Sequence, residues 1–171
     1  MVYKIKNNSK IELLFNNWQE TLIWSCQQDV MGHLYTTSLD DPQFVMALVG
    51  DFCFFAGKPD KELVSFKPQW CQQDFVIMTP QSKEWSDLIE GTFGGRATKV
   101  QRYAIKKEMN IFDADKLKCI VASICGAKLI LECLDRGLYP SWDAQNMGSV
   151  ALAEKLGYHF DHAYDAYEIQ W

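Results

Sequence analysis

The most specific pattern of side chains in the sequence lies in residues 140–158, around a polar turn at Asn146 whose chemistry is hydrogen bonding. Before the turn, residues 141–144 alternate polar and apolar side chains, as a half-buried strand does. After it, apolar residues recur at helical spacing: Val150, Ala153 and Leu156. The Asn146 amide can accept from backbone N–H groups two or three residues on, and Gly157 suits a left-handed C-cap. We predict a strand, a polar turn, a helix capped by Asn146, and a second strand.

Two other groups of residues could bind ligands, but their spacing argues against it. Residues 91–96 are glycine-rich and could form a phosphate-binding loop. They follow a predicted helix and precede a predicted strand, whereas phosphate loops run from strand to helix, so a helix C-cap and turn is the better prediction. His159 and His162 are three residues apart, and on a strand they would point to opposite faces. We therefore expect no metal site there.

Composition limits the class of protein. The chain has 171 residues, of which 48% are hydrophobic and 23% charged, as expected for one ordinary domain or two small ones. A net charge of −5 provides no basic field for nucleic acid, and neither a signal peptide nor a bilayer-spanning apolar run is evident. Six cysteines without a C-x-x-C pair indicate reduced, buried thiols: Cys26, Cys53, Cys71, Cys119, Cys125 and Cys133. We expect a cytoplasmic protein that contacts neither nucleic acid nor membrane.

Patterns in the first two thirds of the chain predict a mixed α/β (α+β) fold with a mainly antiparallel sheet flanked by helices. Two apolar runs, 44–49 and 52–56, are joined by Gly50-Asp51 and predict a tight hairpin. The remaining expected elements are strands at 32–37, 75–79 and 97–107, a helix capped by Ser9 with a break near residues 16–17, a short helix at 61–65, and a helix capped by Ser82.

Two further expectations concern charged residues. The basic residues on the predicted strand at 97–107 are expected on a solvated face or as protection of a sheet edge: Arg102, Lys106 and Lys107. From residue 114 to residue 136 the apolar side chains keep helical spacing without interruption, which predicts one continuous helix. That helix would begin beside Asp113 and Asp115.

The stretch Asn146-x-x-Ser149-x-x-Leu152-x-x-Lys155-x-Gly157-Tyr158 resembles the C-terminal motif of the GNAT superfamily of acyl-CoA-dependent N-acetyltransferases. Residues 125–134 resemble the helix just upstream of that motif. Residues 46–57 and 102–108 are similar to the N-terminal domain of two-domain bacterial members, of the zwittermicin A resistance type. The resemblance implies an N-terminal α/β domain at 1–112, and at 113–171 a helix followed by a partial, shortened GNAT-like unit.

The resemblance also implies an activity: transfer of an acetyl group from acetyl-CoA to an amine of a small molecule. The turn at Asn146 would then lie beside the pantetheine arm of the cofactor, with Asn146 and Ser149 as its hydrogen-bonding residues. A helix cap and a cofactor contact are compatible roles for Asn146.

The sequence departs from the family pattern in two places. The family places an R/Q-x-x-G-x-G/A loop before the helix at 125–134 to hold the CoA pyrophosphate, and the sequence has no such loop, as though the first half of the catalytic domain were missing. A helix beginning at Asp113 and Asp115 would also repel a pyrophosphate. Ala153 occupies the position where many members carry a tyrosine general acid, so the catalytic residues stay unassigned. The alternative function is a non-catalytic remnant or binding module without a CoA site.

Overall fold

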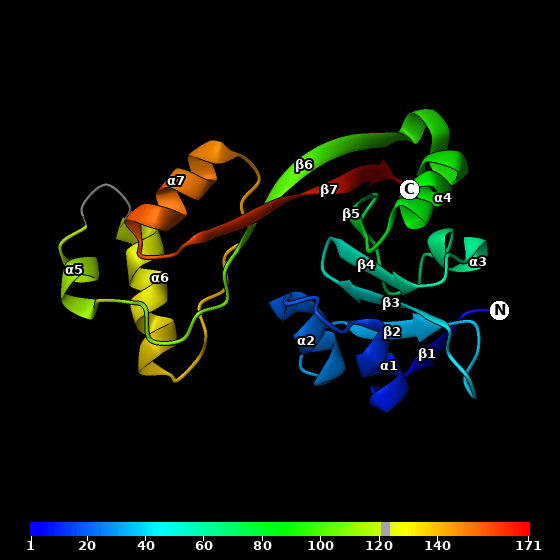
Figure 1. Cartoon of the computed structure of the whole chain (residues 1–171), viewed down its shortest axis with the longest axis horizontal. Helices are drawn as coiled ribbons and strands as arrows, with labels where there is room; N and C mark the ends of the chain where they lie inside the picture. The colour runs from blue at the N-terminus through cyan, green and yellow to red at the C-terminus, as the bar shows by residue number, and fades with distance from the viewer. Residues whose placement is uncertain (121–123) are drawn as a thin grey trace. The chain divides into compact units, whose positions relative to one another are not determined.

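The computed structural model describes residues 1–120 and 124–171 (Figure 1). The chain forms two compact units, residues 1–100 with 165–171 (unit 1) and residues 101–164 (unit 2). The described residues contain a seven-stranded, mostly antiparallel sheet together with helices, which confirms the predicted fold class. The predicted boundary at residue 112 concerns the family origin of the two segments and stays a prediction.

The strands follow the order β1-β2-β3-β4-β5-β7-β6 across the sheet. Pairing is antiparallel from β1 to β4 and between β5 and β7, and parallel between β4 and β5. Their bounds are β1 Tyr3–Ile5, β2 His33–Thr36, β3 Phe44–Val49, β4 Phe52–Gly57, β5 Phe75–Pro80, β6 Ala97–Ile105 and β7 Phe160–Gln170.

The helices are short, and no helix among the described residues is long and apolar enough to cross a membrane. In unit 1 they are α1 Ser9–Leu14, α2 Thr21–Gln27, α3 Lys61–Val64, α4 Lys83–Phe93 and the 3-10 turn η1 Gly94–Arg96. In unit 2 they are α5 Ala114–Lys118, α6 Ile124–Asp135 and α7 Met147–Lys155.

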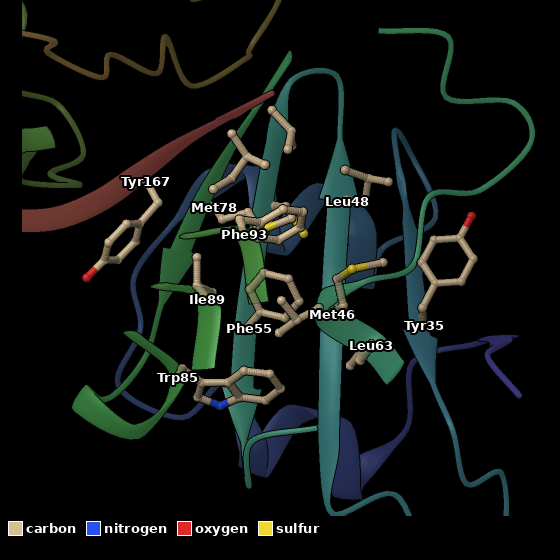
Figure 2. Close-up of a cluster of buried hydrophobic side chains, with 14 residues drawn as sticks. Tyr35, Met46, Leu48, Phe55, Leu63, Met78, Trp85, Ile89, Phe93 and Tyr167 are labelled. Carbon is tan, nitrogen blue, oxygen red and sulfur yellow. The ribbon is translucent and has the colours of Figure 1, made fainter. Parts of the chain in front are cut away.

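Unit 1 is built on the predicted hairpin, in which Val49 lies opposite Phe52 across the turn. Both faces of β3 and β4 are buried, because alternate side chains feed two separate apolar clusters. One cluster joins Met46 and Phe55 to α3 and α4, as Figure 2 shows, and the other joins Val45 and Phe54 to α1 and α2. Helices therefore cover the sheet of unit 1 on both sides.

The cap of the first helix lies one residue earlier than predicted. Asn8, not Ser9, is the N-cap of α1, and its side-chain oxygen accepts from the backbone N–H groups of Lys10 and Ile11 at 3.0 and 3.1 Å. An asparagine amide reaches these groups better than the serine that follows it, which becomes the first helical residue. The predicted break is confirmed near Asn17, whose φ of 66° is incompatible with a continuing right-handed helix.

Unit 2 contradicts the predicted continuous helix at 114–136. Helix α5 ends at Lys118, and α6 begins at Ile124. The backbone N–H groups of Cys119 and Ile120 donate to carbonyls three residues back, at 3.1 and 3.2 Å, which tightens and ends the turn. Ile120 then packs against the apolar cluster of unit 2. Part of the predicted helix, residues 121–123, lies outside the described residues.

The six cysteines differ in exposure, which corrects the expectation that all are buried. Cys26, Cys53 and Cys71 are buried, Cys133 is intermediate, and Cys119 and Cys125 are exposed; all six are free thiols. Helical periodicity placed Cys119, Cys125 and Cys133 in one long predicted helix. A helix that packs on one face leaves the residues of its other face in solvent.

We expect the buried and the exposed cysteines to differ in thiol reactivity. Burial raises the pKa of the Cys26 thiol to about 12 and that of Cys53 well above its ordinary value, so neither supplies thiolate at neutral pH. Titration of the native protein with a thiol-specific chromogenic disulfide should label Cys119 and Cys125 fast and Cys26 and Cys53 only after unfolding. Mass spectrometry identifies the labelled positions, and early labelling of Cys53 would contradict its burial.

Candidate functional site

Asn146 lies where the sequence pattern predicts, at the start of α7. It is exposed and has extended backbone geometry, and its Oδ1 accepts from the Ser149 N–H at 2.9 Å. At the other end of α7, Leu156 is the C-cap and Gly157 follows with a φ of +102°. Both predicted caps of this helix are therefore confirmed, and they fix where α7 begins and ends.

Ser149 is held by a tryptophan from the preceding loop. The indole N–H of Trp142 donates to Ser149 Oγ at 3.3 Å, and the Trp142 ring packs near that of Tyr158, with centroids 5.8 Å apart. Because the serine oxygen accepts this bond, its own hydrogen remains available to an outside acceptor. The structure thus brings the two predicted site residues together on the first turn of α7.

The first turn of α7 carries unused hydrogen-bond donors. Within residues 1–120 and 124–171 no acceptor pairs with the Asn146 side-chain NH₂ or with the backbone N–H groups of Met147 and Gly148. A helix N-terminus leaves such donors free, and a ligand with carbonyl or other acceptor groups can use them. The arrangement offers directed hydrogen bonding at the positive end of the helix dipole.

The loop before the turn is not a strand, contrary to the prediction for residues 141–144. It joins the sheet through an isolated bridge between Ala144 and Tyr103 of β6, whose backbone groups exchange hydrogen bonds of 3.0 and 3.3 Å. Alternation of polar and apolar residues shows that one face of a segment is buried, but it does not show that the segment pairs with a strand. In this loop the apolar face is buried by side-chain contacts and not by strand pairing. The loop nevertheless has a defined position through Ala144, which is fully buried.

Asp143 in this loop is held on both carboxylate oxygens. Arg102 donates from Nε to Asp143 Oδ2 at 3.0 Å and also from Nη2, and the Tyr164 hydroxyl donates to Oδ1 at 2.9 Å. The prediction of a solvated face for Arg102 is wrong, because the residue is buried and only 7% exposed. Burial alone would lower the pKa of its guanidinium, but the hydrogen bond and charge of Asp143 raise it above the ordinary value.

Two tyrosines close to the motif in sequence have structural partners. Tyr158 is 1% exposed and its hydroxyl donates to the Pro140 carbonyl at 2.8 Å. Burial raises the pKa of this phenol far above its ordinary value. Ala153, at the position of the family tyrosine, is fully buried in the cluster of unit 2. These residues position the loop and α7, and the structure adds no general acid among them.

One pair of ionisable residues escaped the sequence reasoning. His159 Nδ1 lies 2.7 Å from Glu108 Oε2, with both side chains substantially exposed. The two residues are 51 positions apart, so no local pattern could have joined them. A carboxylate at Nδ1 orients an imidazole, which is an arrangement that general bases use.

Comparison with known proteins identifies the family. A family model described as GNAT acetyltransferase matches residues 12–123 and 120–167, which together span most of the chain. The chain belongs to the GNAT acetyltransferase family. A crystal structure of a GCN5-related N-acetyltransferase-like protein from Streptococcus suis 89/1591 matches with a TM-score of 0.82 at 30% identity, covering 94% of this chain and 97% of that chain. A comparison with curated proteins found no match.

The charge conflict predicted for this GNAT acetyltransferase required one continuous helix that begins at Asp113 and Asp115, and that helix does not form. Asp113 is the N-cap of α5 and Asp115 lies in its first turn, so both belong to a helix that ends at Lys118. Helix α6, which the resemblance relates to the helix after the pyrophosphate loop, has no acidic residue in its first turn. The predicted repulsion of a pyrophosphate by Asp113 and Asp115 at that helix therefore loses its basis.

Proposed function

We propose that this GNAT acetyltransferase transfers an acetyl group from acetyl-CoA to an amine of a small molecule, with Asn146 and Ser149 beside the pantetheine arm. The observation that supports the proposal is the set of unused hydrogen-bond donors at the first turn of α7. The loop that leads into this turn is held at several points. The two amides of pantetheine present carbonyl acceptors along an extended chain, which suits donors that are already in place.

The proposed step is direct transfer. The neutral amine attacks the thioester carbonyl, a carbon–nitrogen bond forms and the carbon–sulfur bond breaks, and the thiolate of CoA leaves and takes up a proton. A protonated amine must lose one proton before it attacks, and the attacking nitrogen loses a second proton as the amide forms, which balances the proton that the thiolate takes up. The described residues place Tyr158 and Tyr164 in other hydrogen bonds, so the proton carriers stay unassigned.

Finer features of the function are part of the proposal. The family matches in two separate pieces that meet at residues 120–123, which supports the interpretation that a family segment is absent at this point. The zwittermicin A resistance type rests on the resemblance of residues 46–57 and 102–108. We place the reaction in the cytoplasm, in keeping with free thiols throughout the chain.

Calorimetric titration with acetyl-CoA tests the proposal directly. Binding in the micromolar range would support an acetyltransferase and exclude a remnant without a cofactor site. No binding at millimolar acetyl-CoA would favour the alternative, a non-catalytic binding module, for which the missing glycine loop is the specific observation. A thiol-release assay with a panel of amines would then identify the acceptor class if the cofactor binds.

The variant Asn146→Asp separates the cofactor contact from the helix cap. An aspartate caps as well as asparagine but has no side-chain N–H, so we expect the free energy of unfolding to change by less than about 0.5 kcal/mol. Acetyl-CoA affinity should fall about tenfold if the amide donates to pantetheine. Asn146→Ala, which removes both cap and donor, is the matched comparison. Equal affinity in Asn146→Asp and the parent chain would exclude the proposed contact.

A further inference from the structure

Unit 1 contains a cavity that the acetyl-transfer proposal does not use. It has a volume of about 260 Å³ and lies among β1 with the residues just after it, the C-terminal end of α2, and the start of β2. A cavity of this size holds several water molecules or a compact small molecule. Its wall residues all belong to unit 1, so the site is complete within that unit.

One side of the cavity is cationic. Lys4 and Lys6, two positions apart on the N-terminal segment, both line it and are exposed. Throughout the described part of the chain no carboxylate forms an ion pair with either ammonium group. Two unpaired ammonium groups beside a cavity favour a ligand that carries a carboxylate there.

Another part of the wall is anionic and is made by the end of α2. Gln28 is the C-cap of α2, and Asp29 follows with a φ of 56° that stops the helix. The carbonyls of Gln27 and Gln28 accept no backbone hydrogen bond in the ranges described, and Asp29 is exposed without an ion-pair partner there. The negative end of the helix dipole and a free carboxylate favour an ammonium group at this side.

The rest of the wall is partly polar, because His33 lines it and its buried Nδ1 has no hydrogen-bond partner among the described residues. Leu34 and partly buried Ile5 supply apolar surface, and the Cys26 thiol donates to the Leu48 carbonyl at 3.8 Å, so it is no nucleophile. Asn7 carries a buried side-chain oxygen without a partner in the described structure. The NH₂ of the same amide donates to Glu12 Oε1 at 2.9 Å, which fixes the orientation of this side chain.

We propose that this cavity binds a small zwitterionic amine of the α-amino acid class. The ligand carboxylate lies toward Lys4 and Lys6, and its ammonium group lies toward the end of α2 and Asp29. A ligand with a single charge pairs either with the two lysines or with Asp29 and the end of α2, and leaves the other group without a partner. The two ligand charges together therefore provide the selectivity. The inference is independent of acetyl transfer, because it uses no residue of unit 2.

Titration of the full chain with each of the twenty amino acids, followed by heteronuclear NMR shifts, tests this site. At least one should bind with a dissociation constant below about 1 mM, while propylamine and propionate alone should bind at least about tenfold more weakly. Lys4→Gln with Lys6→Gln, and separately Asp29→Asn, should each weaken binding about tenfold. Asparagine tolerates the left-handed geometry of residue 29, so that variant keeps its fold.

The matched control is Lys58→Gln, which removes one exposed positive charge of unit 1 outside the cavity wall and should leave the affinity unchanged. Absence of binding by any amino acid at about 10 mM would overturn the proposal. Equal binding by the singly charged compounds, or by the cavity variants, would overturn it as well. Acetyl-CoA titration of the same variants distinguishes this result from failure of the proposed function, because cofactor binding should be unaffected.

Discussion

Asp143→Ala is expected to lower the free energy of unfolding by about 3 kcal/mol, since it leaves the buried guanidinium of Arg102 without its carboxylate. The carboxylate is partly exposed, so the expected loss is at the lower end of the range for broken buried ion pairs. The substitution also removes the acceptor of the Tyr164 hydroxyl. Urea denaturation followed by far-UV circular dichroism measures the change.

The matched control for this prediction is Asp165→Ala. Asp165 pairs with Lys99 at 2.8 Å, but both side chains are about half exposed, so its removal should cost no more than about 1 kcal/mol. The double variant Arg102→Met with Asp143→Ala should recover much of the loss, because no buried charge is left unpaired. If Asp143→Ala proves as mild as Asp165→Ala, the ion pair is not buried in solution.

Asp143→Ala should also weaken the proposed cofactor site. The ion pair, the Ala144 bridge and the Tyr158 bond to Pro140 together hold the loop that leads into Asn146. Loss of one of these contacts makes the first turn of α7 more mobile. Ligand binding must then order its hydrogen-bond donors, and the lost conformational entropy weakens the affinity. Acetyl-CoA affinity should therefore fall in Asp143→Ala and stay unchanged in Asp165→Ala.

Trp85→Ala should destabilise unit 1 by about 4 kcal/mol, the largest single effect we expect. The side chain is fully buried in the cluster of Figure 2, and its ring stacks on Phe55 with centroids 5.0 Å apart. Its indole N–H also donates to the Gly57 carbonyl at 2.8 Å. Truncation removes the apolar contacts, leaves a cavity and frees that carbonyl, so all three contributions have the same sign.

Two other tryptophan variants separate these contributions. Trp85→Phe keeps an aromatic ring but removes the donor to Gly57, and we expect a loss of about 2 kcal/mol. Trp70→Ala is the control, because Trp70 is 43% exposed. This substitution should lower the free energy of unfolding by only about 1 kcal/mol, even though the Trp70 indole N–H donates to the Tyr35 hydroxyl. Thermal and urea unfolding of the three variants gives the ranking, and equal losses for Trp85→Ala and Trp70→Ala would contradict the described core.

The sequence predicted the hairpin of β3 and β4, the break near Asn17 and both caps of α7, because these features depend on residues within a few positions of one another. It placed Asn146 and Ser149 on the same turn for the same reason. It failed at residues 114–136, where apolar spacing is helical throughout but the backbone turns out of the helix at Cys119. Periodicity shows which residues face a core and does not show where one helix ends.

The sequence by itself determined the family, the fold class and the capped turn at Asn146, since each rests on local pattern or motif. Only the tertiary structure decided that Arg102 is buried against Asp143, 41 positions away, and that His159 meets Glu108. It also decided which thiols reach solvent. Burial and ion pairing depend on which distant segments pack together. Burying a charged side chain destabilises the fold when it has no partner and is tolerated when an opposite charge pairs with it.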